Sequence, residues 1–327
     1  GEVTLKVPKQ RTQTFETAII ERYKRRESSI EEALIEMYLA GVSVRRVEDI
    51  TEALWGTKVS PGTISNLNQK VYEHIETWRN REIELEQPYV YLDGIVLKRS
   101  WGGEIKNVSV LVAIGVGKDG YRRILGACEG HKEDKAGWSG FLAHLKERGL
   151  RGVKLIVSDA CLGLIESIAE YYPDADWQRC MVHFQRNVFS HVPSGKVKQV
   201  ALMLKAIWAQ ENLEAAQEKT RQVVDKLRSM KLSKAGDLVE TSIEETLMFY
   251  RYPQPHWIRI RTNNPLERIM REIRRRTRVV GAFPDGHSAL MLVCARLRHI
   301  AGTKWGTRRY LTMELLDQPQ LEESLTA

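Results

Sequence analysis

Three acidic residues occupy positions where a carboxylate has a reason to bind a cation. Asp93 lies in the middle of the apolar run YVYLDGIVL, where a strand disfavours an acid. Asp159 ends the apolar run VKLIVSD, and ligands gather at the carboxyl ends of strands in α/β sheets. Glu267 lies near the start of the arginine-rich stretch TNNPLERIMREIRRRTR. Each acid also has an alternative explanation that needs no cation. Asp93 would simply face solvent, Asp159 would be a helix N-cap, and Glu267 would belong to a capping box.

The region around Glu267 carries a strong excess of positive charge. Eight arginines and only two acids lie between Arg259 and Arg278. Because a solvated surface usually mixes both signs of charge, we interpret this excess as a surface for phosphates. A carboxylate there would repel its ligand unless a divalent cation lay between them. Two cations about 3.5 to 4 Å apart can assist displacement at a phosphodiester, and the three acids would suffice to bind them.

The sequence after Asn263 predicts the helix that carries these charges. Asn264, Pro265 and Glu267 fit the N-cap, the first and the third helical positions. An apolar stripe at helical spacing specifies the buried side: Leu266, Ile269, Met270 and Ile273. We expect the arginines on the other sides to contact a phosphate backbone, or in some cases carboxylates of a partner subunit: Arg271, Arg274, Arg275, Arg276 and Arg278.

Asp93 and Asp159 belong to a segment with the pattern of an α/β domain. Runs rich in β-branched residues, separated by turn signals, predict an antiparallel meander at 89–97, 107–116 and 121–130. Helices are then predicted at 136–149 and 162–172, and strands at 153–159 and 175–184. The order β-β-β-α-β-α-β predicts a mixed sheet with helices on its faces.

Helical patterns lie on either side of this segment and within it. Residues 12–85 predict either a helix-turn-helix or a plain bundle for packing or dimerisation. In the first case, the third helix would offer polar side chains to a DNA groove: Ser65, Asn66, Asn68 and Lys70. Residues 195–249 are helical again and have the character of an insertion. Trp208 within it would either stack on an unpaired base or fill an apolar core.

These patterns divide the chain into four predicted segments. Residues 1–86 form a helical domain for DNA binding or dimerisation, and residues 87–194 form the first part of the sheet domain. Residues 195–255 form the all-helical insertion, and residues 256–327 complete the sheet domain and end in a polar tail.

The composition excludes several other classes of protein. The 327 residues are 43% hydrophobic, with a formal charge of +8, which fits a globular protein with a polyanionic partner. No window approaches the roughly 18 apolar residues of a membrane helix, so we expect a cytoplasmic protein without a membrane partner. Four cysteines without a C-x-x-C pair indicate reduced thiols. Because the chain begins with Gly1, we expect a further region upstream.

Three motifs resemble one known family. LDGIVLKR, VSDACLGLIESIAEYYPDADWQRCMVHFQRNV and TNNPLERIMREIRRRTRVVGAFPD are similar to the catalytic core of bacterial insertion-sequence transposases of the Mutator type, from about residue 85 to residue 310. The resemblance implies an RNase H-like fold, interrupted by an all-helical insertion, with an Asp-Asp-Glu metal-binding triad. The matching positions are Asp93, Asp159 and Glu267, and Asp174 and Asp176 remain alternatives for the second aspartate.

The resemblance also implies a C-x-x-H motif after the second aspartate, matched by Cys180 and His183. Two further zinc ligands at usable spacing are missing from the sequence. We interpret the pair as structural support or a contact close to the catalytic residues. A satisfied core cysteine is the alternative.

The function implied by the family is transposition of DNA. Two Mg²⁺ ions, for which Mn²⁺ would substitute, would assist cleavage at the terminal inverted repeats, and the freed 3′ hydroxyl would attack target DNA. The implied partners are double-stranded DNA and a second copy of the chain, and the bound protein would associate with the nucleoid. A non-catalytic DNA-binding protein derived from a transposase is the main alternative. An RNase H-like nuclease acting on RNA hybrids fits the arginine helix and the helical insertion less well.

Overall fold

The computed structural model describes residues 52, 71–101, 104–130, 135–280, 283 and 285–317. The chain divides into two compact units, residues 1–78 with 291–299 and residues 79–290 with 300–327. In the first unit, the described part comprises residue 52, helical residues 71–78 and residues 291–299 of α12 (Gly286–Ala301). The predicted helix-turn-helix, with Ser65, Asn66, Asn68 and Lys70, lies outside the described residues.

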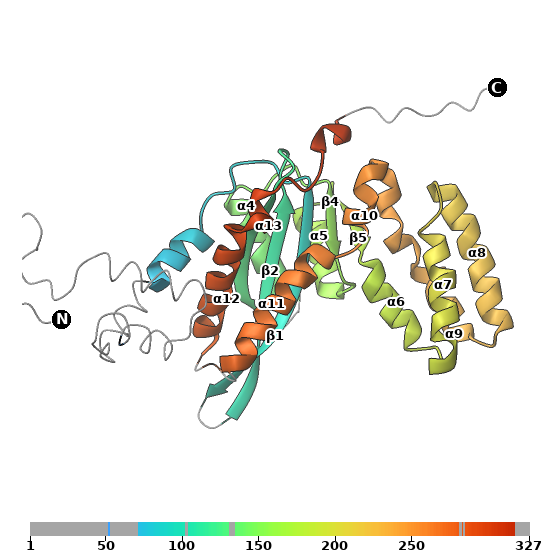
Figure 1. The fold of residues 1–327 in the computed structure, drawn as a ribbon, viewed down its shortest axis with the longest axis horizontal. Helices are drawn as coiled ribbons and strands as arrows, with labels where there is room; N and C mark the ends of the chain where they lie inside the picture. The colour runs from blue at the N-terminus through green and yellow to red at the C-terminus, as the bar shows by residue number, and fades with distance from the viewer. Residues whose placement is uncertain are drawn as a thin grey trace, which may run out of the picture. The chain divides into compact units, whose positions relative to one another are not determined.

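The second unit is built on a five-stranded mixed sheet (Figure 1). Its strands are β1 (Tyr89–Trp101), β2 (Glu104–Val116), β3 (Arg122–Gly130), β4 (Leu155–Ser158) and β5 (Asp176–Arg179). The order is β3-β2-β1-β4-β5, with β1 to β3 antiparallel and β4 and β5 parallel to β1. This arrangement confirms the predicted mixed sheet and is consistent with an RNase H-like fold.

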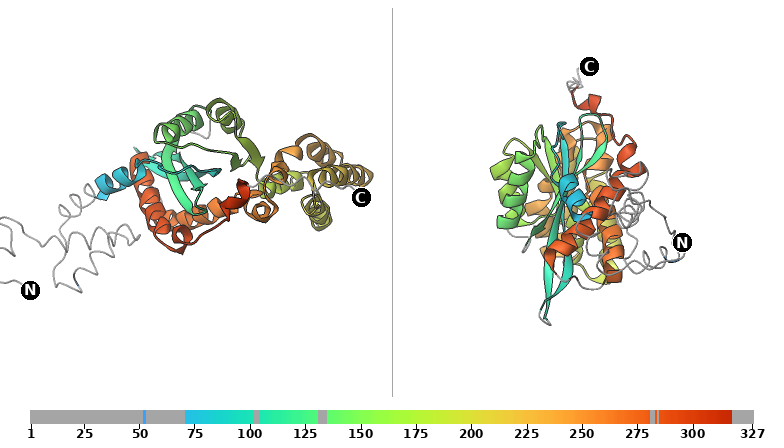
Figure 2. Two further views of the ribbon diagram at one scale, coloured as in Figure 1. Left: turned by 90° about the horizontal axis from the view of Figure 1, so that it is seen from above. Right: turned by 90° about the vertical axis from the view of Figure 1, so that its left-hand side faces the viewer.

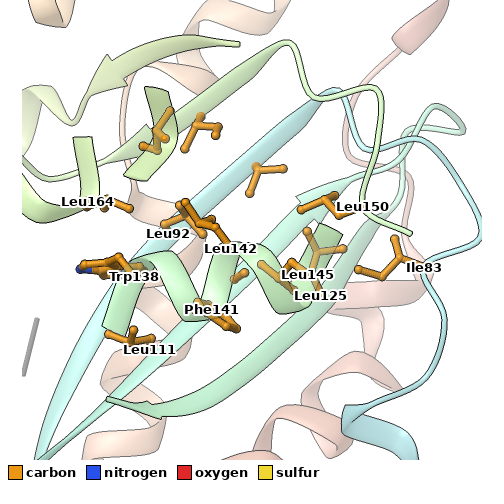
Figure 3. Close-up of a cluster of buried hydrophobic side chains, with 14 residues drawn as sticks. Ile83, Leu92, Leu111, Leu125, Trp138, Phe141, Leu142, Leu145, Leu150 and Leu164 are labelled. Atoms are coloured by element: carbon orange, nitrogen blue, oxygen red, sulfur yellow. The ribbon is translucent and has the colours of Figure 1, made fainter. Parts of the chain in front are cut away.

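One face of the sheet buries an apolar core beneath α4 (Lys135–Glu147) and α5 (Leu162–Tyr171) (Figure 3). Alternate residues of β1, Val90 and Leu92, point to this face and pack with Trp138 and Phe141 of α4. Each fully buried side chain of this size contributes about 1.5 to 3 kcal/mol to stability. The core therefore holds the strands in a fixed register.

The other face of β1 carries polar contacts. Tyr89 Oη lies 2.8 Å from Nδ1 of the buried His256, and Tyr91 Oη donates a hydrogen bond to the carbonyl oxygen of Arg259 at 3.1 Å. These partners belong to a short stretch comprising a 3₁₀ turn, Gln254–His256, and α10 (Trp257–Ile260). Next in the chain comes α11 (Asn264–Val280), which contacts β1 on the face opposite α4 and α5 (Figures 1 and 2).

The segment between β5 and α10 is helical, which was predicted for residues 195–249, and lies beyond the β5 edge of the sheet (Figure 1). Its helices are α6 (Met181–Phe189), α7 (Val197–Ile207), α8 (Leu213–Ser229) and α9 (Ser233–Ser242), with a 3₁₀ turn at Ser194–Lys196. After α12, the chain forms α13 (Lys304–Thr307) and a final 3₁₀ turn, Met313–Leu316. Among the described residues, no helix has the length and apolar character needed to cross a membrane.

One predicted element has the wrong boundary. The strand predicted at 175–184 ends at Arg179, and α6 follows it. The amide of Cys180 still donates to Ser158 of β4 at 2.7 Å, but the Cys180 carbonyl accepts from Phe184 at 3.0 Å and begins a helix. The mostly apolar run CMVHF is compatible with a strand and with a helix, so its hydrophobic pattern alone could not distinguish the two.

A second difference concerns residues 242–250, predicted to be helical. They form two 3₁₀ turns, Glu244–Thr246 and Met248–Arg251. The buried Gln178 side chain donates to the Thr246 carbonyl at 2.8 Å and accepts from the Phe249 amide at 2.9 Å. A distant side chain thus takes up backbone groups that a continuous helix would pair internally.

Candidate active site

Asp93 and Asp159 lie on neighbouring strands that run in the same direction. The parallel ladder of β1 and β4 pairs Tyr91 with Val157. Extending this register by two residues aligns Asp93 with Asp159, which follows the end of β4. Neighbouring strands are about 4.8 Å apart, and equivalent positions of parallel strands point to the same face. The extended register therefore places Asp93 and Asp159 at equivalent positions of adjacent strands, on the face that also carries Tyr91.

Both aspartates are half-buried and are held by the backbone next to them. Asp93 Oδ1 accepts a hydrogen bond from the amide of Gly94 at 2.9 Å. Asp159 Oδ1 accepts one from the amide of Ala160 at 2.7 Å. These local bonds help to orient each carboxylate, whose oxygen atoms are potential ligands of a cation.

Asn263 attaches the start of α11 to β1 beside Asp93. Its Nδ2 donates to the carbonyl oxygen of Leu92 at 2.9 Å, and its backbone amide donates to Cys180 Sγ at 3.2 Å. Its own carbonyl accepts from the amide of Glu267 at 2.9 Å. Glu267 is thus fixed in the first turn of a helix whose starting point is bonded to the residue before Asp93.

Cys180 and His183 close the other side of the site. The backbone of Cys180 bonds to Ser158, directly before Asp159. His183 lies one helical turn later on α6, and its Nε2 is 3.4 Å from Glu267 Oε1. The possible ligand atoms of Cys180, His183 and Glu267 all lie within 4.8 Å of one another. These contacts connect β1, β4, α6 and α11, but among the described residues the group of ligand atoms this close together includes Glu267 and neither Asp93 nor Asp159.

Unsatisfied polar atoms gather around these contacts. Glu267 Oε1, His183 Nδ1 and Asn263 Oδ1 are buried and form no hydrogen bond within the described part of the chain. Leaving such an atom without a partner costs about 1 to 3 kcal/mol, more for a charged group. A cation or ordered water would satisfy the oxygen atoms, so the residues present fit a bound ion.

The donor set suits more than one kind of ion. Carboxylate oxygens of Asp93, Asp159 and Glu267 are the ligands that Mg²⁺ and Mn²⁺ prefer. The sulfur of Cys180 and the imidazole of His183 are softer donors that suit zinc. Burial raises the pKa of the Cys180 thiol, although backbone amides donating to the sulfur act against this.

Comparison with known proteins identifies the family. The model of the family described as "Transposase, Mutator family" matches residues 1–305. The chain belongs to the Mutator family of transposases. It is 37% identical to the transposase for insertion sequence element ISRM5 of Rhizobium meliloti strain 1021, over 96% of this chain and 79% of that protein.

Two further relatives of the transposase have similar coverage. The transposase for IS1081 of Mycobacterium tuberculosis is 37% identical over 96% of this chain and 76% of its own length. The transposase for IS256 in transposon Tn4001 of Staphylococcus aureus is 33% identical over 96% of this chain and 81% of its own length. The resemblance inferred from the three motifs is therefore confirmed over nearly the whole chain.

The predicted arginines of this transposase lie along α11 on its solvent-facing sides. Arg276 is half-buried and the other four are exposed: Arg271, Arg274, Arg275 and Arg278. Arg275 pairs with Glu272 at 2.9 Å, and Arg276 Nε lies 4.0 Å from the same carboxylate. Most of these side chains line one shallow surface depression together with Arg268. The positive face expected from the sequence is therefore present and only partly neutralised.

The remaining predictions for the transposase have mixed outcomes. Trp208 is 2% exposed, and its Nε1 donates to Thr246 Oγ1 at 2.9 Å, so it fills the core and cannot stack on a base in this conformation.

Asp176 pairs with Leu155 at the far end of β4 from Asp159 and bonds to Arg251 and Tyr252. Its position favours Asp159 as the second aspartate.

Asn263 is the residue of the transposase site that the sequence did not single out. The sequence predicted Asn264 as the N-cap, but α11 begins at Asn264 and the Asn263 carbonyl accepts from the amides of Leu266 and Glu267. Asn263 therefore occupies the cap position, and the prediction was wrong by one residue. The signal for Asn263 in the sequence is the presence of two asparagines before Pro265, although a helix needs only one N-cap residue. Only the structure shows that Asn263 contacts both β1 and Cys180.

Proposed function

We propose that this transposase cleaves DNA at the terminal inverted repeats of its element and joins the ends to target DNA, with Asp93, Asp159 and Glu267 as metal ligands. The proposal is supported by the contacts that connect three motifs remote in sequence: the β1–β4 register, the bonds of Asn263, and the contact between His183 and Glu267. The family match supports the substrate class.

The three carboxylates would hold two Mg²⁺ ions, for which Mn²⁺ can substitute. When bound, these ions would lower the barrier of phosphodiester displacement by activating the attacking oxygen and stabilising the leaving oxygen. Asp93 and Asp159 supply the ligand oxygens from the rigid sheet. Glu267 supplies a third from α11, held in place by Asn263 at the start of the helix and by His183 beside its carboxylate.

The overall reaction has two displacements. In the first, water attacks a phosphodiester at the transposon end, the P–O3′ bond breaks, and the 3′ hydroxyl leaves with a proton. In the second, that hydroxyl attacks a phosphodiester of the target, forming one P–O bond and releasing the target's own 3′ hydroxyl. Neither step requires a nucleophile from the protein, which agrees with the raised pKa of the buried Cys180 thiol.

The other parts of the chain have supporting roles in this proposal. The exposed arginines of α11 bind the DNA backbone through paired N–H groups that match phosphate oxygens. Residues 195–255 form a helical insertion between the second and third carboxylates. Two chains act together, since two transposon ends must be joined in concert.

Replacement of Asp93 by asparagine tests the function. Asp93→Asn should abolish Mg²⁺-dependent joining of a pre-cleaved transposon end, because an amide binds a divalent cation much more weakly than a carboxylate. Salt-sensitive DNA binding should remain nearly unchanged. The matched control is Asp225→Asn, which alters an exposed acid on α8 and should leave joining intact.

Undiminished joining by Asp93→Asn would contradict the metal role. If wild type binds the ends in salt-sensitive fashion but never joins them with Mg²⁺ or Mn²⁺, the alternative of a non-catalytic DNA-binding protein would replace the proposal.

A further inference from the structure

A second group of arginines, two of them outside α11, gathers around Tyr310. The guanidinium of Arg122, on β3, lies 4.4 Å from the centroid of the Tyr310 ring and 4.7 Å from that of Trp305. Arg122 Nη2 also donates to the Trp305 carbonyl at 2.7 Å. The guanidinium of Arg259, just before α11, lies 5.1 Å from the Tyr310 ring. The positive charge of Arg268, on α11, acts to lower the pKa of both Tyr310 and Arg122.

The positive charges of this cluster are not neutralised within the described part of the chain. Arg122, Arg259 and Arg268 form no salt bridge with any described residue. Burial lowers the pKa of Arg122, and the charges of Arg259 and Arg268 act in the same direction. Arg122 Nε is buried without a hydrogen-bond partner. Aromatic rings offset part of the repulsion, but three cations brought together in this way favour an anion.

The cluster lies beside the proposed active site on the same face of the sheet. Tyr91, whose hydroxyl donates to the backbone of Arg259, lies two residues before Asp93 on β1. Arg268 follows Glu267 on α11 and lines the same surface depression as the exposed arginines. A polyanion that reaches the three carboxylates would therefore pass over Arg268 and meet the cluster next.

We propose that Arg122, Arg259 and Arg268 form a phosphate-binding site that holds the DNA backbone next to the cleaved position. The identity of the polyanion rests on the proposed function. Tyr310 and Trp305 hold the half-buried Arg122 in place, so that its N–H groups are already oriented when the DNA arrives. The exposed Arg259 and Arg268 would contact the neighbouring phosphates.

The test uses the double variant Arg259→Gln/Arg268→Gln, since both side chains are exposed and their loss should not disturb the fold. Fluorescence anisotropy would measure the affinity of the full chain for a labelled random-sequence duplex over a series of salt concentrations, with a chelator present. Each phosphate contact contributes about 0.9 to the magnitude of the negative slope of log K against log salt. Because the double variant loses two contacts, the magnitude of its slope should fall by about 1.8.

A matched control variant distinguishes the loss of a specific phosphate-binding site from a general loss of positive charge. Arg221→Gln/Lys226→Gln removes the same charge from exposed positions on α8 and should leave the slope unchanged. An unchanged slope in the Arg259/Arg268 variant, or an equal loss in the control, would overturn the inference. Because the measurement requires no metal and no joining, it can succeed even if wild type proves unable to join ends, and the two proposals fail separately.

Discussion

At the scale of single residues, the candidate site depends on Asn263 as much as on the acids. The acids could be predicted because their types and surroundings were unusual: an acid inside a strand, an acid ending one, and a lone glutamate among arginines. Asn263 could not, because its partners Leu92 and Cys180 are far away in sequence. Sequence patterns describe residues that are close along the chain, whereas Asn263 binds residues that are close only in the folded structure.

Asn263→Ala should destabilise the fold and impair joining together. The Leu92 carbonyl would lose its donor in a fully buried position, which costs about 1 to 3 kcal/mol, and α11 would lose its attachment beside Asp93. Urea unfolding monitored by circular dichroism would measure the first effect, and strand joining the second. Asn187→Ala, at an exposed position on α6, should change stability by less than about 0.5 kcal/mol. Wild-type stability and joining in Asn263→Ala would show that this attachment is dispensable.

At the scale of elements, helices and strands with a clear hydrophobic period could be predicted from the sequence. Segments whose structure depends on hydrogen bonds to a distant side chain could not. The meander, α4, α5 and α11 have clear periods, and the structure confirms them. The 3₁₀ turns at 244–251 replace a predicted helix because Gln178 binds their backbone from β5. Likewise, the helical start at Cys180 depends on contacts with Ser158 and Asn263. These contacts bring Cys180 and His183 to the site.

Gln178→Ala should loosen the connection between β5 and the helical segment. The Thr246 carbonyl and the Phe249 amide would both be left without their buried partner, so we expect a loss of roughly 2 kcal/mol or more. Differential scanning calorimetry would measure this loss. The exposed Gln222→Ala on α8 provides the comparison and should stay within about 0.5 kcal/mol of wild type. Equal melting behaviour of the two variants would refute this role for Gln178.

At the scale of the whole second unit, the two faces of the sheet have separate tasks. One face buries the apolar core under α4 and α5, while the other carries the acids, α11 and the arginines around Tyr310. The charge excess near α11 was visible in the sequence. Arg259 and Arg268 belong to that excess, but their grouping with Arg122 of β3 was not visible, because Arg122 is distant in sequence. Catalysis and DNA binding would thus share a face whose shape is fixed by the core behind it.

The most direct test of the central claim is the position of a bound ion. Crystals of the transposase with a transposon end and Mn²⁺ would locate manganese by anomalous scattering. The account predicts ions with carboxylate oxygens of Asp93, Asp159 and Glu267 about 2.0 to 2.2 Å away, the range for small divalent cations. Manganese held by other residues while these three carboxylates remain free of it in the DNA complex would contradict the account.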